Sequence, residues 1–246
     1  MNGTPFKLFN MKTLLQLGVI QQTFFGSSVV DGTNLVDAWS ASSITSVNDG
    51  QAVSTWVGNQ GVLTFTQATE SSMPIFRSNI DGKAALEFSD NHMKTAAYTC
   101  TAEQTVYILF RVTVSPTSVS SMVTQDEAGT SSGRSWHSKF TNTGAAQAVS
   151  FNNTTGQSDT TTNTVSVNTW QVHVNRRSAV DIEAFINTTS NGPTTISAPN
   201  IVTQPITVGK RGVLSEPYSG YIAGIRVYKA NHDATTREAV IAEMMN

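Results

Sequence analysis

The chain ends in "YSGYIAGIRVYKANHDATTREAVIAEMMN", an alternating apolar segment followed by a short polar break and a helical pattern. Alternation with a period of two predicts a β-strand with two distinct faces. We expect one face to carry Ile222, Gly224, Arg226 and Tyr228, and the other Tyr221, Ala223, Ile225 and Val227.

The helical pattern after "NHDA" is too short to be stable alone, so it needs a sheet to pack against. Thr235 or Thr236 is the predicted N-cap, with Glu238 in the first turn. The predicted apolar side consists of Val240, Ile241 and Met244. The ending therefore predicts a strand that completes a sheet and a helix that covers an edge or a face of it.

Composition agrees with a β-rich globular protein. Hydrophobic residues make up 39% of the chain and charged residues only 13%, so Ser, Thr, Asn, Gln and Gly must cover much of the surface. The net charge of −2 and the scattered Lys and Arg indicate neither nucleic-acid binding nor binding to an anionic membrane. The single cysteine, Cys100, excludes an internal disulfide and a Cys-based zinc site.

Further strands are predicted along the chain. The most apolar run, "QTVYILFRVTVS", has the length and β-branching of a central strand. The Thr-rich middle contains aromatic residues at strand-like spacing, which predicts hairpins with strands near 135–140 and 147–151. "WQVHVNRRSAVDIEAFIN" predicts two strands joined by a turn near 176–178, and "GKRG" is interpreted as a hairpin turn because it has no phosphate-loop frame.

Residues 1–33 are interpreted as an N-terminal docking arm, and no stretch is long and apolar enough for a transmembrane helix. "MKTLLQLGVIQQTFFGSS" also loosely matches a signal peptide, although three glutamines interrupt its apolar run. The apolar side chains predicted to dock on a partner by burial are Phe6, Leu8, Phe9, Leu14, Leu17, Phe24 and Phe25.

Four segments, taken in order, resemble the concanavalin A-like, laminin-G-like jelly-roll superfamily. They are "LVDAWSASSITSVNDGQAVSTWVGNQG", "MPIFRSNIDGKAALEFSDNHMKT", "TWQVHVNRRSAVDIEAFIN" and "YSGYIAGIRVYKANHDATTREAVIAEM". The resemblance covers residues 34–246 and implies an all-β jelly-roll sandwich of antiparallel sheets, with the N-terminal arm before it and the short helix after it.

This superfamily includes lectins, glycan hydrolases, adhesion modules and virus structural proteins, so the fold does not decide the function. A single module with an arm and few charges is similar to modules on bacteriophage virions. That similarity implies a noncatalytic structural protein on the particle surface, either a capsid decoration or a fibre-associated protein. Its partner would be the major capsid protein or another virion protein, and a homotrimer suits such a projection. The alternative is a carbohydrate-binding, lectin-like adhesion module.

Some glucan-hydrolysing relatives carry three alternating acidic residues on one strand. In "AVDIEAFI", Asp181 and Glu183 alternate, but Ala179 stands where the third acid would be. Retaining hydrolysis needs two carboxylates about 5 Å apart across the scissile bond. Structural acids on a strand are therefore the favoured interpretation, and a glycoside hydrolase is the least favoured function.

Glycan binding uses exposed aromatic faces and planar polar groups. The loop-rich segment around "GRSWHSKF" offers Arg134, Trp136, His137 and Asn142, with a core position as the alternative for Trp136. Trp39, Trp56 and Trp170 are predicted core residues. No cofactor is expected. Calcium is considered because Asp90, Asn91, Asp126 and Glu127 offer hard oxygen ligands in loops, and because the resemblance includes relatives that bind calcium at the rim of the sandwich.

Overall fold

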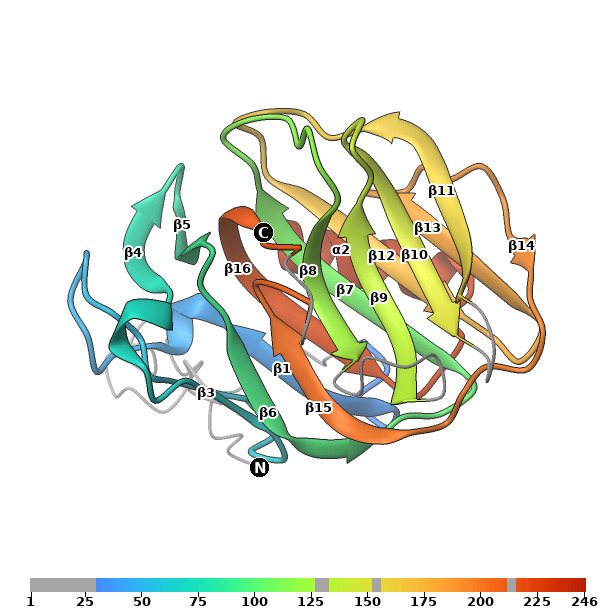
Figure 1. Ribbon diagram of the computed structural model, residues 1–246, viewed down its shortest axis with the longest axis horizontal. Helices are drawn as coiled ribbons and strands as arrows, with labels where there is room; N and C mark the ends of the chain where they lie inside the picture. Colours follow the sequence, from blue (N-terminus) through green and yellow to red (C-terminus); the bar gives the residue numbers. More distant parts are fainter. Residues whose placement is uncertain (1–29, 127–132, 152–155, 212–215) are drawn as a thin grey trace, which may run out of the picture. The chain divides into compact units, whose positions relative to one another are not determined.

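Alternating side chains place the apolar residues of the chain between two antiparallel β-sheets (Figure 1). The computed structural model describes residues 30–126, 133–151, 156–211 and 216–246, and Thr33–Asn246 form one compact unit. The predicted docking side chains, from Phe6 to Phe25, lie outside the described residues.

Sheet A contains the strand that precedes the C-terminal helix. Its eight strands, in spatial order, are β14 (Thr194–Thr195), β13 (Asp181–Ile186), β12 (Gln171–Arg177), β7 (Gln104–Arg111), β16 (Ser219–Tyr228), β5 (Lys83–Ser89) and β4 (Ile75–Ile80), with β1 (Leu35–Ser40) also paired to β16. As predicted, the apolar run "QTVYILFR" is a central strand, because β7 lies between β12 and β16.

Sheet B contains the Thr-rich middle of the chain. Its eight strands, in spatial order, are β11 (Gly156–Thr164), β10 (Ala145–Phe151), β9 (Arg134–Phe140), β8 (Ser120–Asp126), β15 (Thr203–Val208), β6 (Met93–Thr99), β3 (Thr64–Thr66) and β2 (Thr55–Val57). Two short 3-10 helices, η1 (Ala41–Ser43) and η2 (Glu70–Ser72), lie in the connections.

The antiparallel jelly-roll sandwich expected from the sequence is therefore confirmed. The predicted core tryptophans are buried, with Trp39 and Trp56 both close to Phe65 at ring-centroid distances of 4.7 and 5.9 Å. Trp170 is also buried and donates its indole N–H to the Ile80 carbonyl at 3.0 Å.

The predicted faces of β16 are wrong at one point, because the strand contains a bulge between Ile222 and Gly224. An extra residue at a bulge shifts the alternation of the side chains that follow. Ile222 therefore joins Ile225 and Val227 in the core, although simple alternation places it on the opposite face.

The terminal helix α2 (Ala234–Met245) packs against the outer face of sheet A, and its buried residues are the predicted Val240, Ile241 and Met244. The predicted N-cap is wrong: the cap is Asp233, whose carboxylate accepts the Thr236 N–H at 2.8 Å. An aspartate placed before the first turn accepts this orphan N–H, so no threonine is needed.

A buried carboxylate organises the loop between β2 and β3. Asp37, on β1, is fully buried, and its two oxygens accept four backbone N–H groups at 2.7–3.1 Å, from Ala38, Gln60, Val62 and Leu63. The loop approaches so closely that a Cβ added to Gly58 would lie 2.3 Å from this carboxylate. Asp37 therefore ties an edge of sheet B to a strand of sheet A.

We expect Asp37→Asn to lower the free energy of unfolding by about 2 kcal/mol or more, because an amide NH₂ would face backbone N–H groups that need an acceptor. Urea denaturation measures the change. Asp49→Asn is the matched control, since Asp49 is exposed and, among the described residues, accepts from the Ser78 N–H and hydroxyl. Equal effects of the two substitutions would contradict the role assigned to Asp37.

Candidate functional site

A group of interacting charges lies on the outer face of sheet B, between β8, β9 and the segment that leads from β15 to β16. Along β9, Trp136 and Phe140 face the core, so alternation directs His137 and Lys139 to the outer face. We call the following residues the charged cluster: Asp126, Arg134, His137, Lys139, Arg211 and Glu216.

Asp126, at the end of β8, is the centre of the charged cluster, and its side chain is only 1% exposed. One carboxylate oxygen accepts the Arg134 Nε–H at 3.1 Å, and the other accepts the Arg211 Nε–H at 2.7 Å. The second oxygen also lies 2.9 Å from Nε2 of His137. Both oxygens are thus occupied by groups of the protein itself.

Glu216 is the second carboxylate of the charged cluster. It accepts Nη1–H of Arg211 at 2.8 Å and the Ser121 hydroxyl at 2.8 Å. Arg211 therefore bridges two carboxylates and connects the segment after β15 to β8. The connection is reinforced because the Ser121 N–H donates to the Glu216 carbonyl at 3.1 Å.

Burial and charge compete in the charged cluster. Burial alone would raise the pKa of Asp126, but contacts with His137 and Arg211 lower that pKa to about 2. Burial lowers the pKa of His137 to about 4, and Asp126 only partly opposes this shift. At neutral pH the imidazole is therefore uncharged, while the Asp126 carboxylate is balanced by arginines.

The four residues proposed for glycan binding do not form one exposed surface. Trp136 is 1% exposed and packs in the core, so its ring is not available to stack on a sugar. His137 is fully buried, and Asn142 lies in the exposed turn after β9. Arg134 keeps a partly exposed side chain, at 15%, and its guanidinium lies 5.5 Å from the centre of the Phe151 ring.

The oxygen ligands considered for calcium are not assembled in the described residues. Asp126 is occupied as above, and Asn91 uses its amide to bond the Ser89 N–H and the Met73 carbonyl. Glu127 lies outside the described residues. Within the described ranges, no group of three or more His, Cys, Asp or Glu side chains is placed to hold a metal ion.

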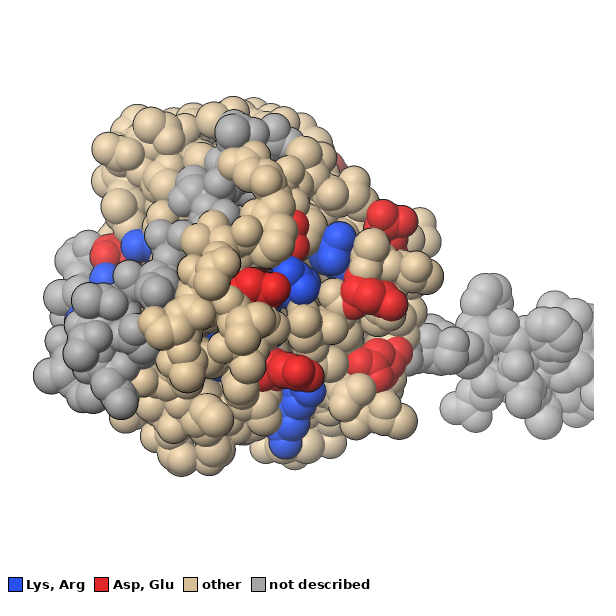
Figure 2. Space-filling model, turned by 90° about the vertical axis from the view of Figure 1, so that its right-hand side faces the viewer, with Lys and Arg blue, Asp and Glu red and all other residues tan. Residues whose placement is uncertain are grey.

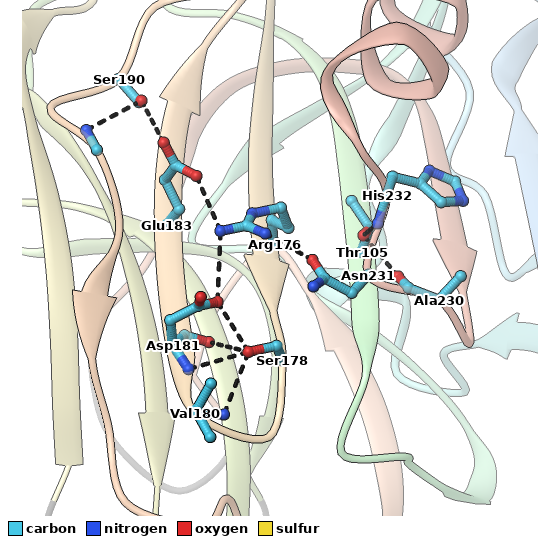
Figure 3. A network of polar contacts seen from close by, with 11 residues as sticks. Thr105, Arg176, Ser178, Val180, Asp181, Glu183, Ser190, Ala230, Asn231 and His232 are labelled. Atoms are coloured by element: carbon cyan, nitrogen blue, oxygen red, sulfur yellow. Dashed lines mark hydrogen bonds and ion pairs between the residues drawn. The ribbon is translucent and has the colours of Figure 1, made fainter.

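The acidic pair from "AVDIEAFI" belongs to a separate network on sheet A (Figure 3). Arg176 of β12 contacts Asp181 at 3.3 Å and Glu183 at 3.0 Å, so one guanidinium is shared by both carboxylates. Glu183 also accepts the Ser190 hydroxyl at 2.5 Å, and Asp181 accepts the Ser178 hydroxyl at 2.8 Å. In a retaining glycosidase, the two carboxylates instead flank the scissile bond.

The Arg176 network also positions the start of α2. Arg176 donates to the Asn231 side chain at 2.7 Å, just before the helix (Figure 3). Nearby, Thr105 of β7 donates to the Ala230 carbonyl at 2.7 Å and accepts the His232 N–H at 3.1 Å. Asp181 and Glu183 therefore have a structural role. The two carboxylates hold Arg176, and Arg176 attaches the residues just before α2 to the sheet.

Sequence reasoning found Arg134, His137 and Asp126 but assigned them to different sites, and it missed Lys139, Arg211 and Glu216. Arg211 lies in "GKRG", and the predicted hairpin turn is wrong because β15 and β16, the strands on either side, belong to different sheets. The chain does bend there: Gly209 has a φ of 91° and approaches the Asn91 carbonyl too closely for a Cβ. A turn pattern carries no signal that its arginine reaches a carboxylate 85 residues earlier in the chain.

Comparison with known proteins supports the fold only. No protein-family model and no curated protein matches the sequence. Among solved structures, domain 4 of AbnA, a GH43 extracellular arabinanase from Geobacillus stearothermophilus in complex with arabinotriose, has a TM-score of 0.64 at 11% identity, over 85% of this chain and 98% of that domain.

Two further solved structures match only in part of their length. The botulinum neurotoxin type G receptor binding domain has a TM-score of 0.62 at 9% identity, and this chain, matched over 86%, spans 51% of it. Trypanosoma rangeli sialidase has a TM-score of 0.61 at 10% identity, over 96% of this chain and 39% of that protein. Such low identities establish a shared β-sandwich fold.

We expect the free energy of unfolding to fall as the pH drops from about 6.5 to about 4, because two buried histidines must stay uncharged in the folded state. Burial lowers the pKa of both His137 and His173 from 6.5 to about 4. Between these values the unfolded chain binds more protons, so each histidine contributes a slope of up to about 1.4 kcal/mol per pH unit.

The measurement is urea denaturation at pH 5 and pH 7.5 for the parent and His173→Gln. The ring of His173 lies beside Phe140 between the sheets, and the Gln variant should show the smaller pH dependence. His92→Gln is the control, since that side chain is half-buried. An unchanged pH dependence in His173→Gln would contradict a buried neutral histidine at this position.

Proposed function

We propose that this protein is a noncatalytic, lectin-like carbohydrate-binding module. The observation that carries the proposal is the charged cluster, a set of planar polar groups held in fixed positions on one sheet face. Arg134 and Glu216 keep partly exposed edges, with side-chain exposures of 15% and 19%. Guanidinium and carboxylate groups already oriented by their partners can bond sugar hydroxyls at a low cost in entropy.

The fold comparison supports the same function. The arabinanase domain, which this chain matches over nearly its whole length, is described in complex with a trisaccharide, and the neurotoxin domain is a receptor binding domain. The similarity lies in the fold, so the binding site and the ligand of this chain must be argued from its own residues.

The Arg176 network supports binding without hydrolysis. A catalytic acid must present a proton to the glycosidic oxygen, and a nucleophile must reach the anomeric carbon. Asp181 and Glu183 instead share Arg176 and are further occupied by serine hydroxyls. A virion location remains a sequence prediction, because the arm on which it rests lies outside the described residues.

We expect the purified protein to retain oligosaccharides in a glycan array and in isothermal titration calorimetry, while releasing no reducing sugar from the same ligands. Arg134→Ala should weaken binding about 10-fold or more, the value of one charged hydrogen bond. The double variant Asp181→Asn, Glu183→Gln should bind like the parent, because its residues lie on the other sheet.

Arg77→Ala is the matched control for Arg134→Ala, since Arg77 is also paired with a carboxylate, Glu87 at 2.6 Å, but lies on sheet A. Thermal melting of each variant separates loss of binding from loss of folding. Absence of binding to every glycan, or sugar release that requires Asp181 and Glu183, would overturn the proposed function.

A further inference from the structure

Lys139 differs from the arginines of the charged cluster because no carboxylate of the described residues lies within ion-pair distance of its ammonium, although Glu216 attracts it electrostatically. Its side chain is half-buried on the outer face of β9, between Ser121 on β8 and Gln147 on β10. Within the described ranges, it makes no hydrogen bond and no ion pair. Burial lowers the pKa of Lys139, Glu216 opposes the shift, and Arg211 adds to it.

The charges of the cluster do not balance. Asp126 is shared by Arg134 and Arg211, and Glu216 is bound by Arg211. His137 is uncharged at neutral pH, as its lowered pKa of about 4 requires. Among the described residues, two carboxylates therefore face three cations, and this part of the cluster carries one excess positive charge. The whole chain, by contrast, carries a net charge of −2.

A row of unsatisfied polar atoms lies beside Lys139 on the same sheet face. Thr207, Thr124 and His137 are adjacent across β15, β8 and β9, and all three are fully buried. Both threonine hydroxyls and Nδ1 of His137 have no hydrogen-bond partner within the described part of the chain. Buried polar atoms of this kind normally bond an ordered water, an ion or a ligand.

The dimensions of this region match a sugar. His137 and Lys139 are about 7 Å apart along the strand, and Thr207 lies two strands away from His137, about 10 Å across the sheet. One or two sugar rings cover such an area. Of the groups in this region, the Lys139 ammonium is on a partly exposed side chain, whereas the two hydroxyls and the imidazole beside it are fully buried. Trp136 is in the core and offers no aromatic face here.

We propose that the charged cluster binds the carboxylate of an acidic sugar, with Lys139 as the counter-ion of that carboxylate. This inference rests on the proposed function and specifies its ligand class. The two arginines, Arg134 and Arg211, hold the carboxylates of Asp126 and Glu216 in position. The buried polar atoms of Thr124, Thr207 and His137 would reach the sugar only through ordered water. A neutral sugar would leave the excess positive charge of the described cluster in place, whereas an acidic sugar would balance it, so the site discriminates by charge.

The test compares matched acidic and neutral ligands by isothermal titration calorimetry at pH 7. The pairs are trigalacturonate with galactotriose, glucuronyl-glucose with cellobiose, and sialyllactose with lactose. At least one acidic member should bind 10-fold or more tightly than its neutral partner, and its affinity should fall as the salt concentration rises. Lys139→Met should remove the difference within the pair, whereas Lys139→Arg should keep it.

Lys229→Met is the control, since Lys229 is exposed after the end of β16 and its removal costs the same charge. Thermal melting shows whether the Lys139→Met variant folds. If it does not fold, the Lys139→Arg variant still tests the inference, because it should keep the preference for the acidic sugar. Equal affinity for acidic and neutral sugars would overturn the inference but leave the proposed function standing. Binding of acetate as tight as that of the best acidic sugar would also overturn it. No binding of any sugar would overturn both.

Discussion

The architecture depends on the hydrogen-bonded ladder of β16, where the most distant parts of the sequence meet. This strand pairs with β7 along one side, and with β5 and then β1 along the other. The bulge between Ile222 and Gly224 bends the strand between its two partners on that side. The same strand then leads into α2, whose Glu243 pairs with Arg226 at 2.8 and 2.9 Å. Sheet A is thereby covered on its inner face by sheet B and on its outer face by the helix.

Where a side chain pattern is local, the sequence was sufficient to predict the structure. Periodicity identified β7, β9, β10 and the buried side of α2, because burial on one face imposes that periodicity. Periodicity did not predict the bulge in β16, where one extra residue shifts the alternation of side chains. It also did not predict that Asp233 is the N-cap of α2, because the position of a cap depends on the backbone conformation before the helix. The charged cluster could not be predicted as a unit, because Asp126, Lys139 and Arg211 meet only through the pairing of β8, β9 and β15. Likewise, nothing in the sequence indicated that Arg176 is the ion-pair partner of both Asp181 and Glu183.

The two ionic networks have different physical characters. The Arg176 network has more carboxylates than cations, and each acid has a hydroxyl or guanidinium partner (Figure 3). Its contacts join two neighbouring strands, a loop and the residues just before α2, so the network stabilises the attachment of the helix to sheet A. The charged cluster joins segments that are distant in sequence and, among the described residues, has one more cation than carboxylates. Because buried ion pairs contribute little net stability, stability alone gives no reason for the spare charge.

The distribution of charge then favours one approach of an acidic ligand. Seen from the side on which β13 and β14 lie, the molecule exposes several groups of acidic side chains with fewer basic ones between them (Figure 2). An anion approaching this side meets the field of those carboxylates, and the Arg176 guanidinium is already occupied by two of them. On the outer face of sheet B, the excess charge of Lys139 has the opposite sign and lies in a partly desolvated place where it is weakly screened. For the acidic sugar that we propose as ligand, this distribution of charge favours the charged cluster over the Arg176 network.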